Sequence, residues 1–278
     1  EFQPHLRTLA LVLKGGGDDR RDVSFGLREV TWNDKDLLIN GRVVNLRTTH
    51  FGLDFALTGY PAMDVAEWRR IIKVCQDYGL NGIRFHSCCP PEAAFTAADE
   101  MGFYLAPECG LWAPFAPGSV YTKYLEEETP LLLKAYGNHP SFVLFSPSNE
   151  PGGRYEQVTP AWAKTWYEKD NRHLYAAGTG WNRPAQVTGG TQYAALVRYG
   201  RGELRNTTGW FGKDFRTALE DVHIPVLAHE IGQWCAYPDF DVIKKFTGYL
   251  RPSNYDIFRY IAEQEGVAKF NHDFAWAS

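Results

Sequence analysis

The sequence has no long apolar run, and its cysteines form no metal-binding pattern. No stretch of its 278 residues approaches the apolar length of a membrane span. The five cysteines include no Cys-x-x-Cys pair and no metal-ligand spacing with histidine, and most are expected to be small buried apolar residues. These absences predict a chain without a membrane segment and without a cysteine-based metal site.

The sequence also lacks an excess of positive charge. Its 29 basic and 33 acidic residues give a formal net charge of −4, and no basic stripe is present. A nucleic acid or an anionic membrane is therefore not expected as a partner. The oligomeric state does not follow from the sequence.

Aromatic residues, in contrast, are abundant. They make up 15% of a chain that is 44% apolar and 22% charged, and they include nine Trp and fifteen Tyr. This composition supports a sizeable core, and the length allows one large α/β domain or two smaller ones. Core packing accounts for part of the aromatic excess, but Trp and Tyr also suit stacking against sugar rings.

Two kinds of organisation follow each other along the chain. Within the first 32 residues, 6–13 and 23–32 predict a strand pair around a glycine turn, and residues 36–46 predict a second pair around Asn40-Gly41. From about residue 44, short apolar strands alternate with amphipathic helices, which indicates a parallel sheet. The predicted strands of this part are 44–51, 83–85, 103–107, 142–145, 174–177, 191–197 and 225–228. The predicted helices are 64–78, 92–101, 122–136, 161–169, 215–222, 241–249 and 254–264, followed by a helical tail at 267–278.

The parallel strands are expected to form a (β/α)8 barrel of the TIM type. Polar residues follow many of the predicted strands, and in a barrel such residues gather at one rim, where functional sites lie. An open sheet with a single switch point would gather fewer of them. After the last strand, no eighth strand is found, so the barrel is predicted to close unusually or to belong to a fragment. The strand-end residues are His50, Arg84, His86, Glu108, Asn149, Glu150 and Glu230.

Glu150 and Glu230 are the candidate catalytic pair. Each follows a predicted strand, and three strand steps around a barrel place them on opposite walls of one mouth. Glycoside hydrolysis requires two such carboxylates, because one protonates the departing oxygen while the other attacks or assists at the anomeric carbon. Arg84 can hold the nucleophile ionised, and Asn149 can bind a sugar hydroxyl. Taken alone, an Asn-Glu pair in a loop is more often a surface feature.

The other strand-end residues each have a structural alternative. His50, His86 and His229 can bind sugar hydroxyls, or they can be partners of neighbouring carboxylates. Glu108 can be a sugar ligand or an acid that supports the site. A metal site from His50, His86 and Glu108 is an alternative with nonspecific spacing, so neither a metal nor a cofactor is predicted. At least one tryptophan after a strand is expected to stack on a sugar, with Trp234 as the first choice among Trp112, Trp181, Trp210 and Trp234.

Several stretches together resemble glycoside hydrolase family 2, within the large clan of retaining (β/α)8 glycosidases. They occur in the family's order and span roughly residues 20–235, which is more specific than any single motif. The matching stretches are FGLRE at 25–29, NGRVVNLR at 40–47, LNGIRFH at 80–86, NHPS at 138–141, SNEP at 148–151 and HEIG at 229–232.

The resemblance implies roles for the residues and an origin for the first strands. It implies that Glu150 is the acid/base, Glu230 the nucleophile and Asn149 the ligand of the 2-hydroxyl, with Arg84 beneath the nucleophile. Residues 1–32 would be the last strands of an immunoglobulin-like β-sandwich, and 33–278 the catalytic barrel. Members of the family usually begin with a sugar-binding jelly-roll, and a periplasmic or secreted location is expected by resemblance.

The leading hypothesis is an exo-acting, retaining β-glycosidase that acts on a carbohydrate, with β-galactoside as the expected substrate. β-Glucuronide is the nearest rival, and β-mannoside and α-L-arabinopyranoside stay open. A second hypothesis is a carbohydrate-binding protein that has kept the barrel and lost hydrolysis. A third is an unrelated metal-dependent barrel hydrolase.

Overall fold

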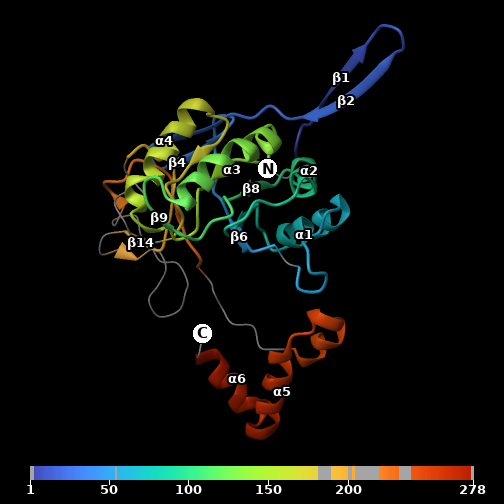
Figure 1. Cartoon of the computed structure of the whole chain (residues 1–278), viewed down its shortest axis with the longest axis vertical. Helices are drawn as coiled ribbons and strands as arrows, with labels where there is room; N and C mark the ends of the chain where they lie inside the picture. Colours follow the sequence, from blue (N-terminus) through green and yellow to red (C-terminus); the bar gives the residue numbers. More distant parts are fainter. Residues whose placement is uncertain are drawn as a thin grey trace.

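The body of the protein is a layer of parallel strands with helices on the outside (Figure 1). The computed structural model describes residues 3–53, 55–180, 189–199, 202–203, 219–231 and 239–276. The strands of the layer are β6 (Thr48–Phe51), β7 (Gly82–Phe85), β8 (Tyr104–Ala106), β10 (Leu144–Phe145), β12 (Leu174–Tyr175), β13 (Ala194–Leu196) and β16 (Val226–Ala228). The helices are α1 (Val65–Asp77), α2 (Glu92–Met101), α3 (Val120–Tyr136) and α4 (Thr159–Lys169).

These strands follow one another across the layer in chain order. β6, β7 and β8 form a parallel three-stranded sheet, and a bridge between Leu105 and Phe142 joins β8 to the start of the β10 segment. β10 pairs with β12, Thr179 after β12 bridges to Ala195 of β13, and β13 pairs with β16. The predicted parallel α/β organisation is therefore confirmed. Within the described ranges no strand pairs on the outer side of β6 or β16, so a closed eight-stranded barrel stays a prediction.

Helix α1 illustrates how the sequence builds the outer layer. The Asp64 side chain accepts a hydrogen bond of 2.8 Å from the backbone N–H of Glu67, which satisfies one of the free donors at the helix start. Apolar residues at helical spacing then turn one face toward the sheet. On that face Trp68 is fully buried, and its ring lies 5.8 Å from that of Phe51 and 6.0 Å from that of Phe85. Burial of such a side chain contributes roughly 1.5–3 kcal/mol.

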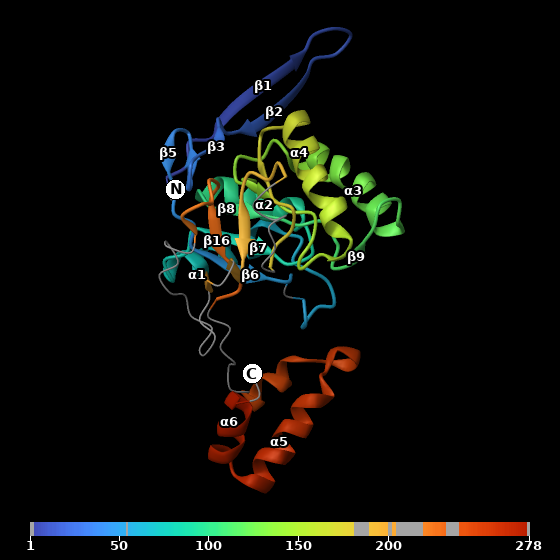
Figure 2. The same ribbon diagram turned by 90° about the vertical axis from the view of Figure 1, so that its left-hand side faces the viewer.

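A small antiparallel sheet covers one end of the parallel layer. Val30 and Leu37 from this sheet are buried in one cluster with Leu144 and Leu174 from β10 and β12. Figure 2 places β3 and β5 at the end of the parallel strands nearest to the β1–β2 hairpin. The predicted boundary after residue 32 falls within this sheet and stays a prediction. The sheet consists of β3 (Val30–Asn33), β4 (Asp36–Ile39) and β5 (Arg42–Val43).

The first strands form the predicted hairpin, which projects away from the body (Figures 1 and 2). β1 (Arg7–Leu13) pairs with β2 (Asp19–Phe25), and almost all of their residues are exposed. The predicted second strand at 23–32 was wrong in its bounds, because the chain leaves β2 at Phe25 and starts a separate strand at Val30. That this hairpin belongs to an immunoglobulin-like sandwich stays a prediction. The remaining strand pairs are β9 (Pro114–Phe115) with β11 (Gly152–Gly153) and β14 (Arg198–Tyr199) with β15 (Gly202–Glu203).

The C-terminal part differs from the prediction in two places. Of the helix predicted at 215–222, residues 215–218 lie outside the described residues, and 219–221 form a turn. The helix predicted at 241–249 is two short 3₁₀ helices, Phe240–Lys245 and Gly248–Leu250. Gly248 has a φ of +55°, which a continuous right-handed helix does not allow.

The last helices, α5 (Ser253–Glu265) and α6 (Val267–Trp276), form a hairpin of their own. Gly266 reverses the chain between them with a φ of +87°, and the rings of Phe258 and Phe270 lie 6.2 Å apart. Figure 1 shows this hairpin at the end of the molecule opposite to β1 and β2. None of the helices in the described part of the chain is long and apolar enough to cross a membrane.

His173 makes the fold sensitive to acid. The residue is fully buried beside β12, with Nδ1 2.9 Å from the carbonyl oxygen of Phe142. Burial and the charge of Arg28 lower the pKa of His173 from its ordinary 6.5 to about 3. Below pH 6.5 the unfolded chain binds a proton that the folded chain does not, so stability is lost as the pH falls. We expect the native protein to lose about 2 kcal/mol more than His173→Gln between pH 7 and pH 5.

Urea unfolding of both proteins at the two pH values measures this difference. Glutamine can still donate to the Phe142 carbonyl but does not titrate. Burial would lower the pKa of His139, but the hydrogen bonds and charges of Asp99 and Glu92 outweigh burial and raise it. Because His139 is present in both proteins, its opposite contribution cancels. If both proteins lost the same free energy of unfolding between pH 7 and pH 5, the assignment of the acid sensitivity to His173 would be contradicted.

Candidate active site

One guanidinium connects the polar residues at the strand ends. Arg84 on β7 donates from Nε to Glu108 Oε1 at 2.9 Å and from Nη2 to Asn149 Oδ1 at 2.7 Å. The same Nη2 lies 2.8 Å from Thr179 Oγ1, and Nη1 lies 3.3 Å from Glu230 Oε1. Arg84 therefore joins residues that follow four other strands, and the predicted convergence of Arg84, Glu108, Asn149 and Glu230 is observed.

Glu108 holds the Arg84 guanidinium in place through hydrogen bonds. Only 1% of its surface is exposed, and its Oε2 accepts a hydrogen bond of 2.8 Å from the Ser87 backbone N–H. Its Oε1 accepts from Thr179 Oγ1 at 2.6 Å as well as from Arg84. Both carboxylate oxygens are thus bonded within the protein. This arrangement favours a supporting role for Glu108 over the sugar-ligand alternative.

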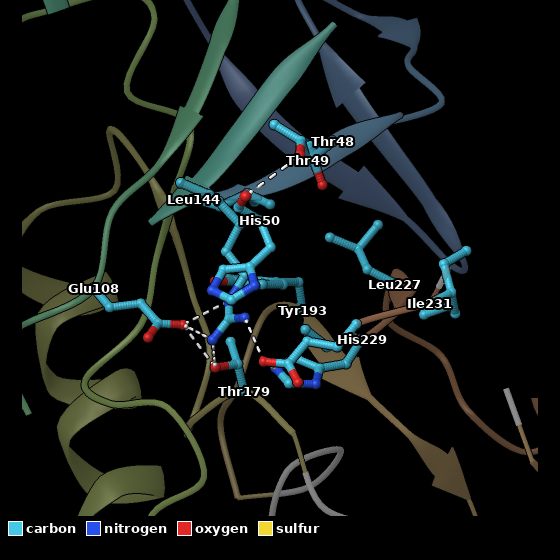
Figure 3. A pocket seen from close by; sticks show the side chains of 15 residues that line it. Thr48, Thr49, His50, Glu108, Leu144, Thr179, Tyr193, Leu227, His229 and Ile231 are labelled. Atoms are coloured by element: carbon cyan, nitrogen blue, oxygen red, sulfur yellow. Dashed lines mark hydrogen bonds and ion pairs between the residues drawn. The ribbon is translucent and has the colours of Figure 1, made fainter. Parts of the chain in front are cut away.

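The cluster opens into a pocket with a cavity volume of about 90 Å³. Its walls come from both edges of the parallel layer, because residues from β6 and from β16 line it together. Figure 3 shows His50, Glu108, Thr179 and His229 entering this space from different sides. The lining residues are Thr48, Thr49, His50, Arg84, Ala106, Glu108, Leu144, Thr179, Tyr193, Ala195, Leu227, Ala228, His229, Glu230 and Ile231.

Three residues around this pocket have strained backbone conformations. The φ angles are +53° for Ser87, +37° for Glu150 and +51° for Glu230. A positive φ costs a residue with a Cβ about 1–2 kcal/mol, and such residues gather at functional sites. Both predicted catalytic carboxylates are therefore held in conformations that the chain does not adopt without support from its surroundings.

The Glu150 side chain passes close to the loop after β12. Its backbone N–H donates to the Thr179 carbonyl at 2.7 Å. At Gly180, which has a φ of +87°, an added Cβ would lie 2.6 Å from Glu150 Cγ and 3.5 Å from His229 Cε1. The glycine thus lets Glu150 approach the side of the pocket that carries His229 and Glu230.

The histidines surround the Glu230 carboxylate. His229 Nε2 lies 3.4 Å and His86 Nε2 lies 4.0 Å from Glu230 Oε1. The His50 ring lies 4.9 Å from that of His86. Burial, followed by the positive charges of Arg84 and His86, lowers the pKa of His50. All three predicted histidines therefore belong to this cluster.

Sequence reasoning missed Thr179, and of the four candidate tryptophans the structure describes Trp112. Thr179 bonds Arg84 and Glu108, and the available signal was its place between Gly178 and Gly180 at the end of a predicted strand. Trp112 is 62% exposed and lies edge-on to His86 with ring centroids 4.9 Å apart, which suits stacking on a sugar. The first choice, Trp234, lies outside the described residues, as do Trp181 and Trp210.

Solved structures that are similar to this chain include glycoside hydrolases. The β-glucuronidase of Parabacteroides merdae superposes with a TM-score of 0.63 at 19% identity over 81% of this chain. The β-galacturonidase of Eisenbergiella tayi, a member of glycoside hydrolase family 2 solved with galacturonate, gives 0.60 at 17% identity over 79%. β-Glucuronidase 2 of Bacteroides uniformis, solved covalently bound to cyclophellitol-6-carboxylate aziridine, gives 0.58 at 16% identity over 75%.

The chain thus shares the fold of family 2 glycoside hydrolases. At these identities the likeness establishes the fold alone. The chain spans 29%, 41% and 27% of the length of these three structures, respectively. No protein-family model matches the sequence.

Thr179 provides a test of how the cluster is held. Thr179→Val removes a donor to the buried Glu108 carboxylate, and a hydrogen bond to a charged group contributes about 1.5–3 kcal/mol. Thr159→Val is the matched control, because Thr159 is equally buried but donates only to the neutral carbonyl of Tyr155, at 3.3 Å. We expect the Thr159 variant to lose about 0.5–1.5 kcal/mol in urea unfolding and the Thr179 variant to lose more. Equal losses would contradict the assigned role.

Proposed function

We propose that the protein is a retaining β-glycosidase in which Glu230 is the nucleophile and Glu150 the acid/base. The observation that carries this proposal is the contact between Arg84 and Glu230, with Asn149 bonded to the same guanidinium. A positive charge 3.3 Å from the Glu230 carboxylate suits a group that must attack as an anion. The fold shared with glycoside hydrolases supports the same reaction class.

The reaction takes two steps. Glu230 forms a bond to the anomeric carbon while the bond from that carbon to the leaving oxygen breaks, and Glu150 donates its proton to that oxygen. Glu150 then removes a proton from a water molecule, which attacks the anomeric carbon and releases Glu230. Both residues have positive φ angles, and strained backbone of this kind gathers at functional sites.

Asn149 is suited to bind a sugar hydroxyl. Its Oδ1 is fixed by Arg84, while Nδ2 is buried and has no hydrogen-bond partner within the described part of the protein. A buried amide without a partner is costly, so a donor held in this way favours a ligand oxygen. The 2-hydroxyl of a sugar on Glu230 is the acceptor that we assign to it.

For the sugar, we propose a terminal β-galactoside, with β-glucuronide as the second candidate. Among the described residues that line the pocket, Arg84 is the one Lys or Arg, and its charge is shared between Glu108 and Glu230. A uronate carboxylate would gain little from it, which favours a neutral sugar. The second candidate is favoured by the likeness to β-glucuronidases and a β-galacturonidase, whose sugars carry a carboxylate.

A carbohydrate-binding protein without hydrolysis is the alternative from another class. The described strands leave the layer unpaired between β16 and β6, next to Glu230. A pocket that is open on this side can bind a sugar without hydrolysing it. Binding measured by calorimetry without release of aglycone would favour this alternative.

A panel of 4-nitrophenyl glycosides tests the proposal. We expect release of nitrophenol from the β-galactoside, and Glu230→Gln should lower kcat by about 10³-fold or more, because an amide cannot form the glycosyl ester. Glu263→Gln, the same substitution at an exposed position of α5, is the matched control and should keep full activity. Full activity of Glu230→Gln would exclude Glu230 as the nucleophile. Turnover of the glucuronide alone would make the second candidate the substrate.

A further inference from the structure

Two histidines and a carboxylate converge at the mouth of the pocket. His50 comes from β6, His86 follows β7, and Glu230 follows β16. One ligand atom from each lies within 4.8 Å of the corresponding atoms of the other two. His50 is exposed, and His86 and Glu230 are partly exposed, so a small ion can reach the group from solvent.

The charge balance leaves this group attractive to a cation. Arg84 lies 2.8 Å from Glu108 and 3.3 Å from Glu230. These two carboxylates share the one guanidinium, so the three groups together carry a formal net negative charge.

The distances are close to those of a metal site. Zinc bonds of about 2.0–2.2 Å in tetrahedral geometry place neighbouring ligand atoms about 3.3–3.5 Å apart. His86 Nε2 and Glu230 Oε1 are 4.0 Å apart, so a small side-chain rotation brings them into range. The exposed His50 has the freedom to follow. Glu108, the carboxylate of the metal alternative in the sequence, is not available because both of its oxygens are bonded within the protein.

We propose that His50, His86 and Glu230 bind one divalent transition-metal ion, of which Zn²⁺ is the best fit. Two imidazoles and one carboxylate form a ligand set that zinc uses with water in the fourth position, whereas Mg²⁺ and Ca²⁺ prefer oxygen ligands. The ion would bind Glu230, which is the nucleophile in the proposed function. The inference of inhibition therefore rests on that proposed function. Zinc binding and sugar binding then exclude each other, and zinc acts as a competitive inhibitor.

Isothermal titration calorimetry of this chain with zinc chloride tests the site directly. We expect one Zn²⁺ per chain, and His50→Gln and His86→Gln should each raise the Kd by about tenfold or more. His223→Gln is the matched control, because His223 is an exposed histidine paired with Asp34 outside the cluster. Circular dichroism of each variant verifies that it is folded. Magnesium chloride in place of zinc should give no saturable binding.

Two readouts separate this proposal from the function on which it rests. Zinc binding that does not saturate, or a Kd that is unchanged in both His50→Gln and His86→Gln, would contradict the metal site. This conclusion would hold whether or not the protein hydrolyses a glycoside. Saturable binding lost in these variants, in a chain that hydrolyses no glycoside, would uphold the site and overturn the proposed function. Where hydrolysis is present, zinc should raise KM without lowering kcat, and EDTA should not abolish activity. Loss of activity with EDTA would contradict the proposal that zinc is an inhibitor and would indicate a zinc-dependent hydrolase.

Discussion

The site depends on one partly buried guanidinium. Arg84 lies among the ends of strands that are far apart in sequence, and its hydrogen bonds orient Glu108, Asn149 and Glu230 at once. Removing it would leave Glu108, which is 1% exposed, as an uncompensated buried charge, at a cost of roughly 3–5 kcal/mol. The residue that arranges the proposed chemistry is thus also one that the fold requires, and Thr179 links the two roles by bonding both Arg84 and Glu108.

The backbone carries part of the same constraint. Glu150 and Glu230 both have positive φ angles, and a residue with a Cβ keeps such a conformation only where its surroundings supply compensating contacts. At Glu150 the backbone bond to Thr179 and the close approach of Gly180 supply them. Rigid placement of this kind lowers the entropy that must be lost when a sugar is held between two carboxylates.

Much of this arrangement could be predicted from the sequence, and the reasons for success and failure are physical. Short apolar strands ending in polar residues predicted the parallel layer and the convergence of Arg84, Asn149 and Glu230, because parallel strands bring their ends to one edge. The two 3₁₀ helices at 240–250 were not predicted, because the helical spacing of apolar residues does not reveal that Gly248 adopts a left-handed conformation. Thr179 was missed because a hydroxyl between two glycines carries no charge pattern that marks it as a link.

The most direct test of the proposed mechanism is to identify the residue that forms a covalent bond with a substrate analogue. A cyclophellitol aziridine is opened by a nucleophilic carboxylate and leaves a stable ester, so intact mass and peptide mapping reveal the residue that attacked. With galacto-configured and 6-carboxylate probes compared side by side, we predict one label per chain, on Glu230, and a faster reaction with the galacto-configured probe. A label on Glu108 or on another residue, or no label from either probe, would contradict the account of Glu230 as the nucleophile beside Arg84.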